Sequence, residues 1–420
     1  MDPSNNPPVP ESYIESLAAE APVGDFNHAD PTHQGFVQDT ASRIQEETDP
    51  DQVERFLLSR RDEFPLAMHL AAKLAKSRKA VGSLSGPVML SVIFAVYKEH
   101  HRLMRPDEHE AGEDFLRRKA AQLDWLSGAS PHLSWELLAV DDGCPAGSGA
   151  LIAEIARNEG LDNVRVLHLE EAIRDKLPVA GGLRTTDDSR KGGSIIYGMW
   201  EAAKKPATTG EQVVLYTDAD LSTHLGQAGL LIEPIVNGGM DVAMGSRREE
   251  TSVVIKKGKR NVRGKLFIYL WKRMLSPALL DVTDTQCGFK AFRAEAAIEI
   301  LDDLLERGFA FDVELLLKTE LRNPGSLARV PIAWIDSEGE STTTALSPYL
   351  TMLQSIAAMN RKYLSPFGQA EDFTAFVESL DEMQWNQLMD NVPDAIASAD
   401  PLQFGHFNEV SSDDLKNSIA

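Results

Sequence analysis

The 420-residue sequence contains little cysteine, fewer basic than acidic residues, and no long hydrophobic run. Its two cysteines, Cys144 and Cys287, stand far apart without metal-type spacing, so neither a disulfide framework nor a structural zinc site is predicted. The 42 Lys and Arg against 64 Asp and Glu give a formal net charge of -22, which repels nucleic acid backbones and disfavours DNA or RNA as a partner. No window reaches the roughly 18 apolar residues that span a bilayer, and the N-terminus lacks the pattern of a secretory signal. We therefore expect a soluble, cytoplasmic chain without a transmembrane segment.

The sequence divides into four predicted parts. Residues 1–45 are rich in Pro, Asn, Asp and Glu, which predicts a flexible leader. Residues 46–85 show helical spacing and are expected to form a helical extension. Residues 86–345 have the texture of an α/β domain, and residues 346–420 predict a helical and acidic C-terminal extension.

Short apolar runs alternate with helical segments beyond residue 86, the pattern of βαβ units around a parallel sheet. Strands are predicted at 89–96, 135–140, 164–167, 213–217, 241–244 and 328–334. Helices are predicted at 115–127, 150–158, 195–205, 225–237, 263–275, 294–306 and 313–321. The expected fold class is α/β, an open, mostly parallel sheet flanked by helices, with an N-terminal helical extension and a C-terminal helical tail.

One of these helical segments, "KLFIYLWKRML" at 265–275, mixes apolar and basic residues. Such a segment could lie at a membrane interface as a peripheral contact. An ordinary packing helix shows the same pattern and is the more common explanation.

In the run "VVLYTDADLST" at 213–223, a predicted apolar strand is followed directly by Asp218 and Asp220. Ligands of open parallel sheets bind outside the carboxyl ends of strands. Two carboxylates there suit a hard cation such as Mg²⁺, which shares its shell with substrate phosphates, and the small Ala219 leaves room for a ligand. The alternative is that the aspartates only cap the following helix.

Other strand ends and loops carry polar residues of the same kind. In "VDDG", Asp141 and Asp142 could bind a base or ribose, although a turn explains them too. In "SRKGGSIIYG", Lys191 and Gly192 precede an apolar helix, where backbone and cation could meet a diphosphate, or where a helix simply begins.

A basic cluster stands out in the acidic chain and suggests an anionic ligand such as a phosphate, although charge runs are usually solvated loops. Its members are Arg247, Arg248, Lys256, Lys257, Lys259, Arg260, Arg263 and Lys265. Further on, Asp284, Lys290, Asp312 and Glu314 are each candidates for a site or for a structural ion pair.

Taken together, these stretches resemble glycosyltransferase family 2, and within it the dolichyl-phosphate glucosyltransferase and mannose synthase group. The resemblance covers about residues 88–345 and rests on "LSVIFAVYKEHHRL", "VDDG", "RKGGSIIYG" and "DTQCGFKAFR…GFAFDVELL…VPIAW". It implies the GT-A fold, a Rossmann-like open sheet. The chain departs from the family pattern at Ala95, Lys98, Cys144, Ser222 and in the loop "SEGESTT" at 337–343.

The resemblance also assigns roles to residues of this sequence. The nucleoside would be held by Ala95, Tyr97, Glu99, Asp141 and Asp142, with Lys191 and Gly192 near its phosphates. Asp218 and Asp220 would hold Mg²⁺ or Mn²⁺. The acceptor's phosphate would meet Arg247, Arg260 and Arg263, and we add Lys290 to this group.

We therefore expect an inverting glycosyltransferase that moves a hexose, with glucose from UDP-glucose as the favoured donor. The acceptor would bear a phosphate, polyprenyl phosphate among the options, or a hydroxyl. A hydroxyl acceptor would need a base, for which Asp284 and then Asp312 are the candidates, with Asp220 as the metal-linked catalytic group. Two alternatives stay open: a sugar-1-phosphate nucleotidyltransferase, and a non-catalytic module that binds a nucleotide sugar.

Overall fold

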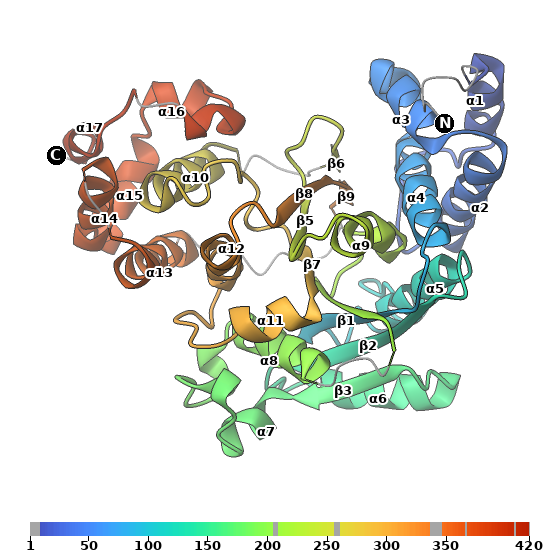
Figure 1. Ribbon diagram of the computed structural model, residues 1–420, viewed down its shortest axis with the longest axis horizontal. Helices are drawn as coiled ribbons and strands as arrows, with labels where there is room; N and C mark the ends of the chain where they lie inside the picture. Colours follow the sequence, from blue (N-terminus) through green and yellow to red (C-terminus); the bar gives the residue numbers. More distant parts are fainter. Residues whose placement is uncertain are drawn as a thin grey trace.

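A seven-stranded sheet forms the centre of the protein in the computed structural model, which describes residues 9–204, 209–255, 261–336, 347–365, 368–406 and 409–419 (Figure 1). The strand order is β3-β2-β1-β4-β7-β5-β8. The strands are β1 (Val88–Val96), β2 (Leu133–Asp141), β3 (Val164–His168), β4 (Glu211–Thr217), β5 (Val242–Ser246), β7 (Phe289–Arg293) and β8 (Leu327–Pro331). The pairs β1–β2, β1–β4, β2–β3 and β5–β8 are parallel. The predicted α/β fold with a mostly parallel sheet is confirmed.

Strand β7 was not predicted, and it runs antiparallel between β4 and β5. Its five residues, "FKAFR", have a basic residue at positions 2 and 5, so they lack the apolar run of the other central strands. The predicted strand at 328–334 is also split in two. Pro331 ends β8, because proline has no N–H for the ladder, and the chain continues as β9 (Ala333–Ile335), which pairs with β6 (Val253–Ile255) in a second small sheet.

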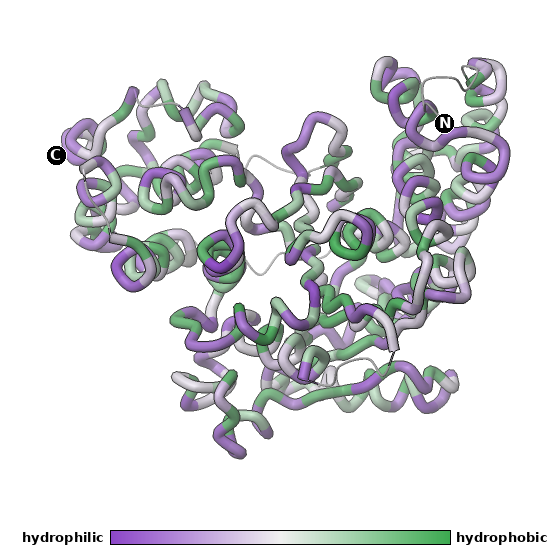
Figure 2. Tube along the Cα trace, in the orientation of Figure 1, coloured by the Kyte–Doolittle hydropathy of each residue, from purple (hydrophilic) through white to green (hydrophobic). Residues whose placement is uncertain are grey.

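Helices cover both faces of the sheet, which explains why β1 is buried almost throughout. The helices of this part are α5 (Phe115–Ser127), α6 (Ser148–Glu159), α7 (Leu169–Arg174), α8 (Gly192–Ala203), α9 (Ala228–Val236), α10 (Asn261–Leu275), α11 (Ala294–Ile300) and α12 (Phe311–Arg322). Alternate residues of β1 enter different apolar clusters: Ile93 packs with residues of α8 and α11, whereas Val92 packs with residues of α5 and α9. Along the outer helices, hydrophobic and hydrophilic residues alternate, as amphipathic packing requires (Figure 2).

The expected flexible leader is wrong for the described part of residues 1–45. Helices α1 (Glu11–Ala18) and α2 (Pro31–Glu47) lie there, and they pack with α3 (Pro50–Ser59) and α4 (Leu66–Gly82) around a cluster of their own. Helix α2 begins at an Asp30 cap, whose carboxylate accepts a hydrogen bond from Thr32 N at 2.7 Å. Its buried Val37, Ala41 and Ile44 follow helical spacing, which the polar composition around them obscured.

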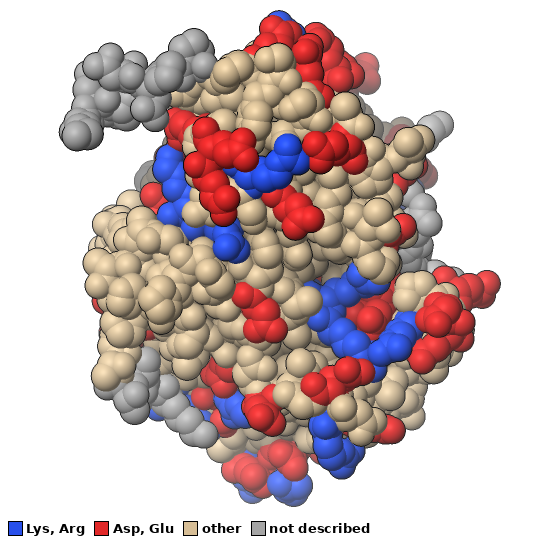
Figure 3. Space-filling view, turned by 90° about the vertical axis from the view of Figure 1, so that its right-hand side faces the viewer, with Lys and Arg blue, Asp and Glu red and all other residues tan. Residues whose placement is uncertain are grey.

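These N-terminal helices also hold the segment that follows β5. The cluster around α2 and α4 includes Val253, Ala333 and Ile335 of the small sheet. Arg61 Nη2 donates to Ser252 O at 2.8 Å. On the side of the molecule that these helices form, basic side chains lie interspersed with acidic ones (Figure 3).

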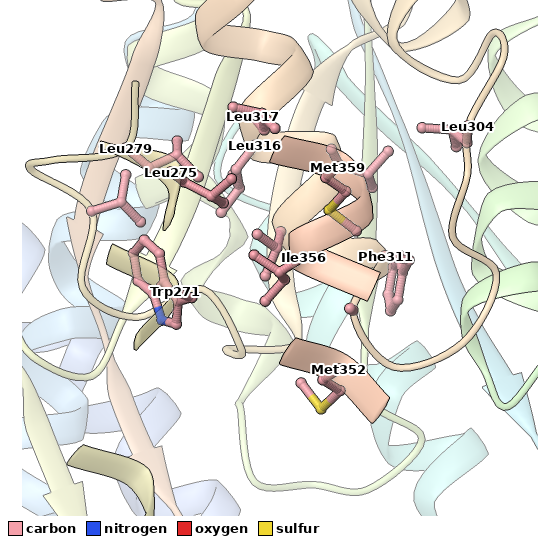
Figure 4. Packing of buried hydrophobic residues seen from close by; sticks show 14 of the residues in the cluster. Trp271, Leu275, Leu279, Leu304, Phe311, Leu316, Leu317, Met352, Ile356 and Met359 are labelled. Carbon is pink, nitrogen blue, oxygen red and sulfur yellow. The ribbon is translucent and has the colours of Figure 1, made fainter. Parts of the chain in front are cut away.

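The C-terminal extension packs around α10, which agrees with the ordinary packing helix favoured for 265–275 over a membrane contact. Its elements are α13 (Ser347–Tyr363), α14 (Gln369–Ser379), α15 (Glu382–Asp390), α16 (Asp394–Ser398), the 3-10 turn η6 (Pro401–Gly405) and α17 (Ser412–Asn417). Trp271 and Leu275 of α10 lie in one cluster with Leu316 of α12 and Ile356 of α13 (Figure 4). Within the described ranges, every helix is too short or too polar to cross a bilayer.

The packing of α2 predicts a stability effect that a flexible leader would not show. We expect Ile44→Ala, at a fully buried position, to lower the free energy of unfolding by about 2–5 kcal/mol. The exposed Glu46→Ala on the same helix should change it by less than about 0.5 kcal/mol. Chemical denaturation of the two variants measures both values, and equal midpoints would contradict the packing.

Candidate active site

The carboxyl ends of the central strands meet at one edge of the sheet. Val96 at the end of β1 lies opposite Asp141 at the end of β2, and Ile93 lies opposite Tyr216, one residue before the end of β4. The loops that carry the predicted site residues therefore start from neighbouring positions, as expected for a ligand site of an open α/β sheet.

Lys191 joins two of these loops. Its backbone N–H donates to Asp142 Oδ2 at 3.2 Å, and its ammonium makes an ion pair with Asp218. Lys191 has φ +92°, in a region that costs a residue other than glycine on the order of 1–3 kcal/mol. Such strain clusters at functional sites, and here it aims main chain and side chain of one residue at two carboxylates.

The charges around this pair act on the acidity of both partners. Burial would raise the pKa of Asp218, but Lys191, followed by Arg247 and Lys119, outweighs burial and lowers it. Burial would lower the pKa of Lys191, and Asp218 reverses the shift and raises it. Both groups are therefore charged at neutral pH, and their side chains remain about one-third accessible, at 34% and 33%.

The two aspartates of "VDDG" have different surroundings. Both carboxylate oxygens of Asp141 accept backbone hydrogen bonds, from Cys144 N at 2.7 Å and from Gly149 N at 2.9 Å. Asp141 therefore shapes the turn into α6. Asp142 accepts a hydrogen bond from Ser194 Oγ at 2.7 Å, and burial raises its pKa in spite of that bond.

Lys119 is a site residue that no motif in the sequence singles out. It lies on α5 with no exposed surface, and its Nζ donates to Asp218 O at 3.0 Å and to Asp220 O at 2.8 Å. Burial lowers its pKa to about 8, against the charges of Asp220 and Asp218. A buried cation thus fixes the main chain of the turn. Lys119 lies about 100 positions before the turn along the chain, so no motif that spans both could indicate it.

Glu99 and Asp220 complete the side of the site near β1. Ser222 N donates to Asp220 Oδ1 at 3.0 Å. Arg102 bridges Glu99 at 3.0 Å and Glu113 at 2.8 Å, and burial together with the charge of Asp220 raises the pKa of Glu99. Tyr97, just before them, keeps 43% of its surface exposed and is available to a flat ligand.

Two of the departures from the family pattern lie against each other beside Tyr97. The N–H of Lys98 donates to Cys144 Sγ at 3.1 Å. Lys98 has φ +59°, a left-handed conformation that asparagine, the family's usual residue there, adopts more readily. The thiol therefore stabilises a strained lysine at the end of β1.

Arg247 and Asp284 form a closed pair at the end of β5. The guanidinium meets the carboxylate through Nε at 2.8 Å and Nη2 at 2.7 Å, and Arg247 N adds a third bond at 2.8 Å. Burial would raise the pKa of Asp284, but Arg247 lowers it strongly instead. Asp284, 4% exposed, is thus a weak base that anchors Arg247.

Lys290 and Asp312 also form a pair in the interior. Lys290 is fully buried and donates to Asp312 Oδ1 at 2.6 Å and to Cys287 O at 2.5 Å, and Tyr216 Oη bonds to the same carboxylate. The expected contact of Lys290 with an acceptor phosphate does not fit this burial. A general-base role for Asp312 does not fit either, because its Oδ1 already accepts hydrogen bonds from Lys290 and Tyr216.

Several predicted site residues have roles in packing or in holding the main chain, and others lie away from the turn of Asp218 and Asp220 or outside the described residues. A Cβ on Gly192 would clash with Gly308 O, so this glycine lets α8 start against the main chain. Glu314 accepts hydrogen bonds from Leu305 N and Glu306 N at 2.7 Å each. Arg263 is exposed on the first turn of α10. Ala95 is half-buried in β1 and Ala219 is buried between the two aspartates, whereas Arg260 and the 337–343 loop lie outside the described residues.

Gly288 is a second residue that sequence reasoning missed. A Cβ at this position would clash with the carboxylate oxygens of Asp218. The start of β7 can therefore approach the carboxylate only because no side chain is present.

The carboxylates suit a hard cation in type but not in number. Among the residues that the structure describes, no three His, Cys, Asp or Glu side chains gather as a ligand set. Asp218 and Asp220 supply oxygen ligands of the kind that Mg²⁺ and Mn²⁺ prefer. A cation there would have to complete its shell with oxygens of a ligand or of water.

The contacts of Lys119 predict a local effect that a general loss of stability would not produce. Hydrogen bonds from charged donors contribute about 1.5–3 kcal/mol each, so we expect Lys119→Met to raise amide exchange across 218–222 about tenfold or more. Hydrogen exchange with mass spectrometry measures this.

Lys272→Met is the matched control, because Lys272 is buried, donates to Leu280 O at 2.7 Å and has a pKa lowered by burial to about 8. Faster exchange at 218–222 in both variants alike would contradict a specific role of Lys119.

Comparison with known proteins identifies relatives of the chain, although no family model matches it. Glycosyltransferase AglD of Haloferax volcanii is 24% identical over 275 residues, which are 66% of this chain but only 37% of AglD. Dolichyl-phosphate beta-glucosyltransferase of Drosophila melanogaster is 27% identical over 274 residues, 63% of this chain and 71% of the relative. The Homo sapiens protein of the same name is 26% identical over 286 residues, 66% and 76% of the two chains.

Among solved structures, mannosyl-3-phosphoglycerate synthase from Rubrobacter xylanophilus aligns with 74% of this chain and 82% of its own, with 15% identity and a TM-score of 0.44. That likeness is too low for conclusions about the site. The sequence relatives confirm the predicted resemblance: over about two thirds of its length the chain is similar to a glycosyltransferase and to dolichyl-phosphate beta-glucosyltransferases.

Proposed function

We propose that the chain transfers a hexose from a nucleotide sugar to a phosphate-bearing acceptor, with inversion at the anomeric carbon. The observation that carries the proposal is the convergence of Asp142, Lys191 and Asp218 at one sheet edge. Arg247 follows the end of β5, which is separated from β4 by β7 in the same sheet. The dolichyl-phosphate beta-glucosyltransferases among the relatives favour glucose as the sugar, for which we propose UDP-glucose as the donor.

The donor would lie along the ends of β1, β2 and β4. Tyr97, with its exposed ring, would stack on the base, and Glu99 and Asp142 would bind the nucleoside. Lys191 would leave part of its contact with Asp218 and neutralise the diphosphate. Asp218 and Asp220 would hold Mg²⁺ or Mn²⁺, which acts as a Lewis acid on the leaving diphosphate.

The pairing of the other carboxylates favours a phosphate over a hydroxyl acceptor. A hydroxyl needs a base, and both candidates are engaged: Asp284 by Arg247, and Asp312 by Lys290 and Tyr216. A phosphomonoester has a second pKa of about 6, so it is already an anionic nucleophile at neutral pH. Within the described residues, Arg247 binds Asp284 through Nε and Nη2, and Nη1 would be the group that meets the incoming anion.

The proposal predicts which product the donor yields. Purified protein with Mn²⁺ or Mg²⁺, UDP-glucose and a phosphorylated acceptor should release UDP together with the glucosylated acceptor, and chelation of the metal should stop it. Release of pyrophosphate from glucose 1-phosphate and UTP would instead support the nucleotidyltransferase alternative. Binding of UDP-glucose with neither product would support a non-catalytic module.

The two carboxylates of the turn predict how much activity is lost when either is removed. We expect Asp218→Asn and Asp220→Asn to lower kcat about 100-fold or more, because each weakens the binding of the cation that would orient and neutralise the leaving diphosphate. Asp187→Asn, at an exposed position in the loop before Lys191, should retain the activity of the unmodified protein. Full activity of Asp220→Asn would contradict the proposed role.

A further inference from the structure

Over the described stretch from Leu266 to Leu275, helix α10 has no apolar face that is open to a ligand or a bilayer. Its six successive residues from Leu266 to Trp271, together with Met274 and Leu275, are each at most 6% exposed. A helix at the surface of a protein buries one stripe and exposes the other. Burial at every position of a full turn and a half means that α10 is covered on all sides.

The C-terminal extension supplies much of this cover. The ring of Tyr269 meets Phe373 of α14 at 5.9 Å and Phe404 of η6 at 5.4 Å, both edge to face. Tyr269 Oη donates to Val410 O at 2.5 Å, and Asn360 Nδ2 of α13 donates to Met274 O at 2.5 Å. Hydrogen bonds and apolar packing together therefore hold the C-terminal extension against α10.

This cover also reaches the start of α10. Lys265 Nζ, near the start of α10, donates to Ala397 O of α16 at 2.8 Å. Burial lowers the pKa of Arg248, next to Arg247, and the charges of Asp284 and, more weakly, of Asp400 just before η6 oppose that shift. The extension thus places a carboxylate within electrostatic reach of Arg248, the residue next to Arg247.

We propose that the acceptor is a water-soluble phosphorylated compound, and that the C-terminal helices occupy the α10 surface on which a lipid acceptor's hydrocarbon chain would otherwise lie. An interfacial helix needs an open apolar face to bind a bilayer. The net charge of -22 further repels anionic lipid. The inference rests on the proposed transfer to a phosphate and names the acceptor class that this site takes.

Vesicle flotation tests the inference without relying on turnover. The full-length protein is mixed with phosphatidylcholine vesicles that contain phosphatidylglycerol and dolichyl phosphate, and is then centrifuged through a density gradient. We expect the protein to stay in the dense fraction. Flotation of the unmodified protein with the vesicles would overturn the inference.

A matched pair of variants tests whether the cover is what hides α10. Phe404→Asp puts a charge at a fully buried position against Tyr269, and we expect at least part of this variant to float. Leu402→Asp, two residues away and 46% exposed, should stay in the dense fraction. If Phe404→Asp stays folded by circular dichroism, shows faster amide exchange across 266–275 by mass spectrometry and still does not float, the α10 surface is no lipid site and this part of the inference is wrong.

Turnover then compares the two acceptor classes directly. UDP release from UDP-glucose is measured with glycerol 3-phosphate and glucose 6-phosphate, and separately with dolichyl phosphate in detergent. We expect at least a tenfold larger stimulation by one of the soluble phosphates, and a larger stimulation by dolichyl phosphate would overturn the inference. If no acceptor of either class stimulates UDP release, the result counts against the proposed function. The flotation experiment still decides the inference in that case.

Discussion

The turn of Asp218 and Asp220 depends on two lysines that reach it from different helices. Lys119 of α5 holds the carbonyl groups from the interior, and Lys191, just before α8, pairs with the Asp218 carboxylate. With both lysines charged, the two aspartates are balanced before any ligand arrives. Lys119 has no exposed surface and cannot follow a ligand, whereas Lys191 is partly accessible and can exchange one anionic partner for another. A fixed cation and an exchangeable one thus share the turn.

The sequence predicted the parts of the site that depend on strand ends. Apolar runs mark β1, β2, β4 and β5, and because parallel strands end at one edge, the residues that follow them are expected to lie together. Tyr97, Asp142, Asp218 and Arg247 belong to this predictable set. Lys119 and Gly288 do not, because a lysine within an ordinary amphipathic helix and a glycine before a short strand carry no local signal. Their roles arise only when α5 and β7 pack against the turn.

The two buried ion pairs show the same limit from the opposite side. Asp284 and Asp312 are residues of the right kind for acid–base chemistry, and spacing along the chain offers no means to find their partners. Arg247 lies 37 positions from Asp284, and Lys290 lies 22 positions from Asp312. Because the fold pairs Asp284 and Asp312 with cations, neither carboxylate is available as a general base. This pairing favours an acceptor that is already ionised.

The attachment of the N-terminal helices bears on how the catalytic part could be isolated. Arg61 binds the main chain at Ser252, and Val253, Ala333 and Ile335 belong to the apolar cluster of α2 and α4. A chain trimmed to start at residue 86 would leave these three side chains without cover and the strand pair β6–β9 without its support. The predicted domain at 86–345 therefore depends on the N-terminal helices for part of its apolar cover.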